Sequence, residues 1–170
     1  MDMQISEKIL GQIEVVFNEI LSAYTKMADL YEVKKNALIK MDAEILKETD
    51  EQILANNDLL IDLNNERLRI IKQMGVEEMT VSEIIEKAEE IQSPLLNYFK
   101  EFKVKINEVS KKMTLLEQTN VELIQHGLAM SNTILDIILQ ACTPQGVGYD
   151  CHGKNSQSQS TGVSSICEDA

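Results

Sequence analysis

Apolar residues recur along the first 41 positions in alternating steps of three and four. Lys34 is the one polar position in the row. This spacing places the apolar side chains on one face of an α-helix and is typical of a coiled-coil-like seam. The row consists of Leu10, Ile13, Phe17, Ile20, Tyr24, Met27, Tyr31, Leu38 and Met41.

A second helix is predicted from Asp42, whose side chain suits an N-cap, to Gly75, which suits the left-handed residue after a helix end. The two helices are separated so briefly that a single rod and an antiparallel hairpin both remain possible. Its apolar row is Leu46, Ile53, Leu60, Leu63, Ile70 and Met74.

A short third helix and a long fourth one follow. Thr80 and Glu83 have the spacing of a capping box, and Ser93 followed by Pro94 is a typical helix start. The long helix is predicted to run to about Ala141, with a seam at Leu95, Phe99, Phe102, Ile106, Val109, Met113, Leu116, Asn120, Leu123, Gly127, Met130, Ile134, Ile137 and Ala141. Asn120 is expected to be a buried amide that sets helix register.

Beyond Cys142 the chain becomes rich in Ser, Gln and Gly. Such a segment buries too little apolar surface to offset the entropy of ordering, so we expect disorder. The predicted fold class is all-α: an elongated antiparallel helical hairpin or bundle of long helices over residues 1–142, with a flexible tail over residues 143–170. No repeat or second domain is predicted.

Charge and composition exclude several classes of function. The net charge is −12, which disfavours nucleic-acid binding because phosphates require clustered Lys and Arg. The chain has neither a signal-peptide pattern nor an apolar run of about 18 residues, so we expect a cytoplasmic protein without membrane insertion and with reduced thiols.

Candidate chemistry centres on the segment GYDCHGK, where Cys151 adjoins His152. Cys142 and Cys167 are too scattered around this pair for a zinc site, and nothing nearby would activate a thiolate. His126 on the long helix is expected to be solvated. We therefore predict no enzyme activity, no cofactor and no metal site.

The long helix loses its charged face towards its end. Eight charged residues lie between Tyr98 and Thr119, but only Glu122 and Asp136 lie between Asn120 and Ala141. A second apolar stripe appears there, interrupted only by Ser131: Val121, Ile124, Leu128, Leu135, Ile138 and Cys142. The stripe is either buried within a three-helix monomer or exposed as a surface for a partner helix, and both hold if it packs loosely until a partner helix replaces the internal contact.

The sequence resembles the FlgN-type flagellar export chaperones. The segment from Lys34 to Gly75, in which Leu38, Asp42 and Leu46 precede a run ending in Glu66 and Arg67, is similar to the family's central pattern. The segment EQTNVELIQHGLAMSNTILDIIL is similar to the C-terminal helix, with an asparagine at Asn120, and Tyr149, Asp150 and Gly153 match a Y-D-x-x-G tail motif. Cys151, His152 and the 17 residues after Gly153 depart from the simplest pattern.

The resemblance implies a chaperone that holds hook-filament junction (hook-associated) proteins by their terminal helices and delivers them to the type III export apparatus. It also implies that Tyr149, Asp150 and Gly153 dock onto the cytoplasmic domain of the export gate. The residues expected to contact the client are Val121, Ile124, Leu128, Leu135, Ile138 and Leu139.

Two other classes of function stay open at the level of sequence. The heptads would also suit a structural or regulatory coiled-coil adaptor that forms a homodimer and has no export client. A small metal- or redox-regulated protein would need Cys151 and His152 to act, which we do not expect.

Overall fold

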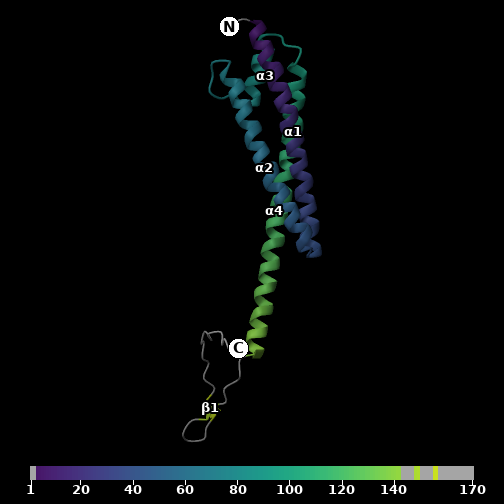
Figure 1. Cartoon of the computed structure of the whole chain (residues 1–170), viewed down its shortest axis with the longest axis vertical. Coiled ribbons are helices and arrows are strands. Elements are labelled where there is room, and N and C mark those ends of the chain that lie inside the picture. The colour runs from purple at the N-terminus through teal and green to yellow at the C-terminus, as the bar shows by residue number, and fades with distance from the viewer. Residues whose placement is uncertain (1–2, 143–147, 150–154, 157–170) are drawn as a thin grey trace. The chain divides into compact units, whose positions relative to one another are not determined.

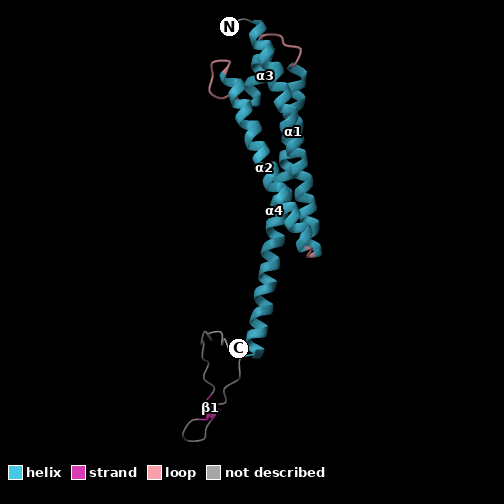
Figure 2. Ribbon diagram, in the orientation of Figure 1, coloured by secondary structure: helices cyan, strands magenta, loops and turns pink. Residues whose placement is uncertain are grey.

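The computed structural model describes residues 3–142, 148–149 and 155–156. They form the helices α1 (Met3–Lys40), α2 (Ala43–Lys72), α3 (Val81–Glu90) and α4 (Leu96–Cys142), followed by two short strands, β1 (Gly148–Tyr149) and β2 (Asn155–Ser156) (Figure 2). The chain divides into two compact units, Met1–Leu128 and Ala129–Ala170. The predicted all-α class is confirmed.

α1 and α2 form an antiparallel hairpin, so the two helices do not fuse into a rod. The Asp42 carboxylate caps α2 by accepting a hydrogen bond from the Ile45 N–H at 3.1 Å. Across the hairpin the Asn56 side chain donates to the Ala23 carbonyl at 2.9 Å, and Lys34 pairs with Asp50 at 2.6 Å. The cap starts α2 as a new helix, and the two contacts hold α2 against α1. The nearly continuous apolar pattern therefore belongs to two helices and not to one.

The seam predicted for α1 is correct except at its end. Met41 is 79 % exposed and has a φ of 56°, because it forms the turn into α2 instead of the last turn of α1. A left-handed residue cannot continue an α-helix, so the apolar periodicity extends one residue beyond the true end of the helix.

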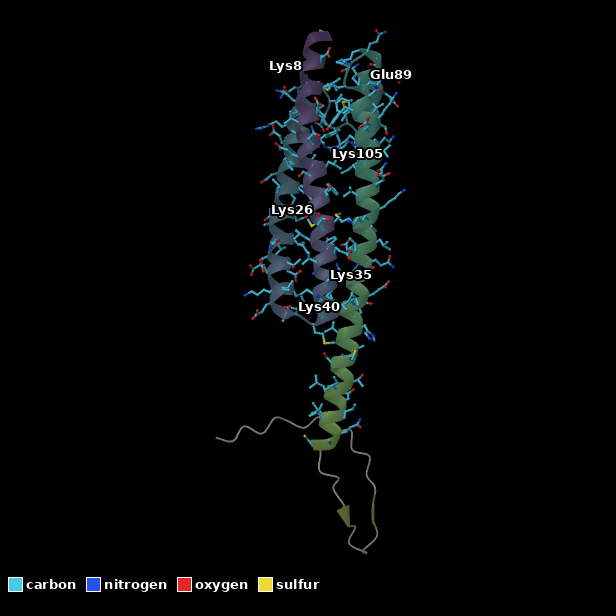
Figure 3. The ribbon with its side chains drawn as sticks, turned by 90° about the vertical axis from the view of Figure 1, so that its right-hand side faces the viewer. Lys8, Lys26, Lys35, Lys40, Glu89 and Lys105 are labelled. Atoms are coloured by element: carbon cyan, nitrogen blue, oxygen red, sulfur yellow. The ribbon has the colours of Figure 1, made fainter. Side chains whose placement is uncertain are left out.

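Lys8, Lys26, Lys35 and Lys40 follow one another along the length of α1 (Figure 3).

The predicted start and stop signals around α3 are confirmed. Thr80 and Glu83 form both hydrogen bonds of the capping box, and hydrogen bonds with Thr80 lower the pKa of Glu83. Gly75 has a φ of 82° in the loop after α2. Ser93 accepts a hydrogen bond from the Leu95 N–H at 3.3 Å, and α4 begins at Leu96, two residues later than Pro94 suggested.

The core of the first unit lies where α1, α3, the end of α2 and the start of α4 meet (Figure 1). Phe17 of α1 stacks on Phe102 of α4, with ring centroids 4.2 Å apart, and meets Phe99 edge to face at 5.9 Å. Ile84 and Ala88 of α3 are fully buried in the same cluster. All three Phe residues of the chain therefore lie together where four helices meet.

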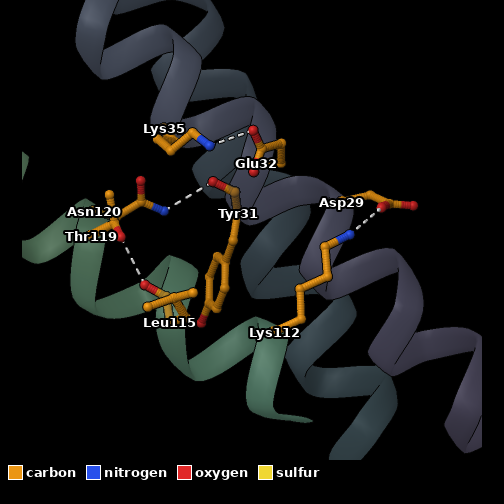
Figure 4. A network of polar contacts seen from close by, with 8 residues as sticks. All are labelled: Asp29, Tyr31, Glu32, Lys35, Lys112, Leu115, Thr119 and Asn120. Carbon is orange, nitrogen blue, oxygen red and sulfur yellow. Dashed lines mark hydrogen bonds and ion pairs between the residues drawn. The ribbon is translucent and has the colours of Figure 1, made fainter. Parts of the chain in front are cut away.

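Farther along α4, polar contacts hold it to α1 (Figure 4). The Asn120 side chain donates to the Tyr31 carbonyl at 3.0 Å, and Lys112 lies 3.7 Å from Asp29 (Figure 4). Asn120 is 4 % exposed, as predicted for a buried amide, and its Oδ1 atom accepts no hydrogen bond from the residues that the structure describes. The amide thus sets the register between the two helices at some cost in stability.

Tyr98 links α4 to α1 and causes the stability of the protein to fall at alkaline pH. Its hydroxyl lies 3.1 Å from the Glu14 carbonyl oxygen and 3.0 Å from Asn18 Oδ1. Burial, with a contribution from the Glu14 charge, raises the pKa of Tyr98 from 10.0 to about 12. The neutral phenol therefore stabilises the fold fully below pH 10, and this contribution is lost as the pH rises towards 12.

We expect Tyr98→Phe to be less stable than the wild type at pH 8, and the difference to shrink between pH 10 and pH 11.5. Urea unfolding of both proteins at each pH measures this difference. Ionisation of the Lys side chains affects both proteins equally and cancels. A difference that stays constant over this range would contradict the role given to the Tyr98 proton.

Of the second unit, the structure describes the end of α4 and the strand pair. Every residue of α4 from Ala129 to Cys142 is exposed. β1 and β2 pair antiparallel, with Gly148 opposite Ser156 and Tyr149 opposite Asn155. The rest of the predicted flexible tail lies outside the described residues.

Candidate protein-binding surface

α4 changes from a packed helix to an exposed one along its length. Phe99, Phe102, Leu116 and Asn120 are buried, and the other seam positions up to Gly127 are half-buried. After Asn120 no described residue of α4 is buried, although the apolar pattern continues. Helices pack only where a neighbouring element covers their apolar face, and this part of α4 carries apolar side chains that stay exposed among the residues that the structure describes.

In the first unit, the predicted stripe residues Val121, Ile124 and Leu128 are 47 %, 37 % and 61 % exposed. They follow one another at steps of three and four and so share a face of α4. Glu122 is the one ionised side chain among residues 120–128, and its neighbour His126 is exposed as predicted. Exposing a largely uncharged apolar stripe of this kind to water is unfavourable, and such stripes often mark sites of protein interaction.

In the second unit, the predicted residues Leu135, Ile138 and Leu139 are 55 %, 51 % and 60 % exposed. The seam residues of this segment are exposed as well: Met130 at 46 %, Ile134 at 54 % and Ile137 at 60 %. The apolar residues therefore cover more of this segment than one stripe, and the polar residues Asn132, Thr133, Asp136 and Gln140 share the remaining face. The interpretation that the stripe is buried within the monomer is wrong for Val121, Ile124 and Leu128, which are exposed in the first unit.

The remaining predicted site residues belong to the tail. The structure describes the backbone of Tyr149 in β1, and Asp150 and Gly153 lie outside the described residues. Cys151, His152 and Cys167 lie outside them too, and Cys142 is an exposed free thiol. Within the described part of the chain, His, Cys, Asp and Glu side chains form no group of three that could hold a metal ion.

The row of α2 that faces α1 contains polar residues that the apolar pattern alone did not reveal. Asn56 is 2 % exposed, Thr49 is 3 % exposed, and the Arg67 side chain is 16 % exposed. The signal was available, because steps of three and four from Leu46 pass through all three positions. A row drawn through the apolar residues alone omits Thr49, Asn56 and Arg67.

None of the helices that the structure describes is both long enough and apolar enough to cross a membrane. Amphipathic helix surfaces are suited to packing against another helix.

These observations define the class: a helical protein whose long α4 helix carries an exposed apolar surface as its candidate site. The comparison with known families then identifies the chain, because the family described as FlgN protein matches residues 9–157. The chain belongs to the FlgN family of flagellar chaperones. No curated protein matches the sequence, and no solved structure matches the fold.

Proposed function

We propose that this FlgN-family chaperone binds the C-terminal helices of hook-associated junction proteins through the exposed apolar part of α4. The residues proposed to contact the client are Val121, Ile124, Leu128, Leu135, Ile138 and Leu139. The observation that carries the proposal is their exposure on a helix segment with only two ionised side chains, Glu122 and Asp136. Covering the terminal helices of a client would prevent their premature assembly before export.

Helix-on-helix packing gives a physical basis for this activity. A client helix laid along α4 would remove apolar side chains of both partners from water, and each Leu that becomes fully buried contributes about 1.5–3 kcal/mol. Release of the client needs no nucleotide, because competition at the export apparatus and export of the client both favour dissociation of the complex.

We further propose that the tail docks onto the cytoplasmic domain of the flagellar export gate through Tyr149, Asp150 and Gly153. This assignment rests on the Y-D-x-x-G motif, which lies in the matched range 9–157. A tyrosine supplies a large contact area with few rotatable bonds, which makes it an effective anchor in a protein interface.

Tyr149→Ala is expected to weaken binding to the gate domain by about 10-fold or more, since aromatic anchors often contribute about 2 kcal/mol. Binding of the client should not change. Pull-downs with a purified gate domain and with a junction protein measure the two activities on the same preparation, and Tyr149→Phe serves as the matched control. If client binding falls together with gate binding, the tail is part of the client site and the proposal of separate sites is wrong.

A further inference from the structure

α3 occupies one end of a groove between α2 and α4 in the first unit. Lys103 of α4 donates to the Ser82 hydroxyl of α3 at 2.9 Å. On the other side, Arg67 of α2 donates to the Met79 carbonyl just before α3 at 3.5 Å. Ile84 of α3 is fully buried at the base of the groove. This end of the groove therefore has the width of a helix.

The groove continues open beyond the N-terminal end of α3. Two cavities of about 220 and 270 Å³ lie along it and share Tyr24 of α1 and Leu60 and Asn64 of α2. Val81, the first residue of α3, lines the first cavity, and Met113 of α4 lines the second. Residues of α1, α2 and α4 thus line one groove, of which α3 covers only a part.

A row of apolar residues shares one face of α2 and changes from buried to exposed along the helix, and Ile61 of this row lines the second cavity. Leu54, Ile61 and Leu68 are each seven residues apart, and Ile71 lies one turn farther on the same face. Ile71 is fully buried in the cluster that holds α3, whereas Ile61 is 52 % and Leu54 is 65 % exposed. The exposed part of the row is as apolar as the part that already packs against α3.

Arg67 is the one charged residue among those that line the two cavities. Its side chain is 16 % exposed, and its Nε atom is buried without a hydrogen-bond partner in the described part of the chain. Its existing contacts are long, at 3.7 Å to the exposed Glu78 and 3.5 Å to the Met79 carbonyl. A buried guanidinium donor left unpaired is costly, and a carboxylate is the group that satisfies it best.

We propose that this groove is a second docking site, which binds an amphipathic helix of a partner protein. The apolar face of that helix packs on Tyr24, Leu60 and Met113, and an acidic side chain beside the apolar face pairs with Arg67. The site is separate from the α4 residues proposed for the client and does not depend on that proposal. The position of α3 between α2 and α4 shows how a helix fits this groove. The positive charge of Arg67 favours a partner helix with an acidic side chain at that position.

Two other occupants fit the groove less well. A second copy of the chain carries a net charge of −12, so two copies repel one another at close approach. Residues 143–170 contain only four large apolar residues, Val147, Tyr149, Val163 and Ile166, which are too few to form the continuous apolar face that the groove requires. A partner helix with its own apolar face meets both requirements.

The test uses two synthetic amphipathic peptides of about 18 residues, long enough to cover the groove at 1.5 Å per residue. They are identical except for one Glu or Gln beside the apolar seam, and each carries one Trp. Because the full chain contains no Trp, peptide fluorescence reports binding directly. We expect the wild type to bind the Glu peptide about 10-fold more tightly than the Gln peptide, as a charge-assisted hydrogen bond predicts.

Arg67→Gln should remove the preference for Glu. Ile61→Glu, at an exposed position that does not threaten folding, should weaken binding of the Glu peptide more than that of the Gln peptide. Leu128→Ser should change neither affinity, which separates this site from the proposed client surface. Absence of binding by both peptides, or a preference that survives Arg67→Gln, would overturn the proposal.

The same measurements identify the other occupants. A dimer in light scattering that Ile61→Glu dissociates would assign the groove to a second copy. Tighter peptide binding after deletion of residues 143–170 would assign it to the tail. Either result would also overturn the proposal.

Discussion

Replacing Leu128 and Leu135 of α4 together by Ser is expected to reduce the affinity for a hook-associated junction protein by about 100-fold or more, which is about 3 kcal/mol. The two leucines are 61 % and 55 % exposed in the chaperone alone, and a client helix would cover both. Replacing each by Ser removes the apolar area that drives association and introduces a hydroxyl that must be desolvated. Titration calorimetry with the purified junction protein measures the loss.

The matched control is the double variant Val104→Ser and Leu115→Ser. These residues are 57 % and 67 % exposed on the same helix, but they lie in its charged part, outside the proposed client surface. The control should bind the client as the wild type does, and both variants should show wild-type helicity. Unchanged client binding by a folded Leu128 and Leu135 variant would exclude this surface as the client site.

Light scattering on the same samples separates the chaperone from a coiled-coil adaptor. A monomer that forms a 1:1 complex with the junction protein agrees with the proposed function. A stable dimer without client, dissociated by the Leu128 and Leu135 replacements, would show instead that the exposed part of α4 pairs with a second copy.

Phe17→Ala is expected to lower the free energy of unfolding by about 3–5 kcal/mol, the cost of removing a buried aromatic ring and leaving a cavity. Phe17 is 1 % exposed, and its ring contacts both Phe99 and Phe102. It therefore joins α1 to the start of α4, where the two helices are far apart in sequence. Urea unfolding followed by circular dichroism at pH 7 measures the change.

Val15→Ala is the control for Phe17→Ala, because Val15 lies two residues away on the same helix and is 58 % exposed. We expect it to change the free energy of unfolding by less than about 0.5 kcal/mol. A loss below about 1 kcal/mol for Phe17→Ala would contradict the packing of the aromatic cluster.

Local signals along the chain were sufficient for most helix boundaries. Asp42, the Thr80 and Glu83 capping box, Gly75 and Ser93 each act through hydrogen bonds or backbone angles within a few residues, so their effects are visible in the sequence. Met41 shows the limit of periodicity. An apolar residue at the correct spacing does not reveal that the chain turns there, because the turn depends on the α1 and α2 faces meeting.

The buried polar residues needed the tertiary structure. Asn56 finds its partner at the Ala23 carbonyl, 33 residues away, and Asn120 finds its partner at the Tyr31 carbonyl, 89 residues away. Asn120 could be predicted as a buried amide from its seam position, but its partner could not. Arg67 belongs to the family pattern in the sequence, yet its half-buried position in a groove appears only in the structure.

The sequence by itself determined the helices, the all-α class and the loss of charge along α4, because periodicity, capping and composition act locally. Only the tertiary structure decided that α1 and α2 form a hairpin and that the end of α4 stays exposed. The physical reason is that burial depends on which faces meet. The same pattern of apolar residues is a core where another helix covers it and an exposed surface where none does.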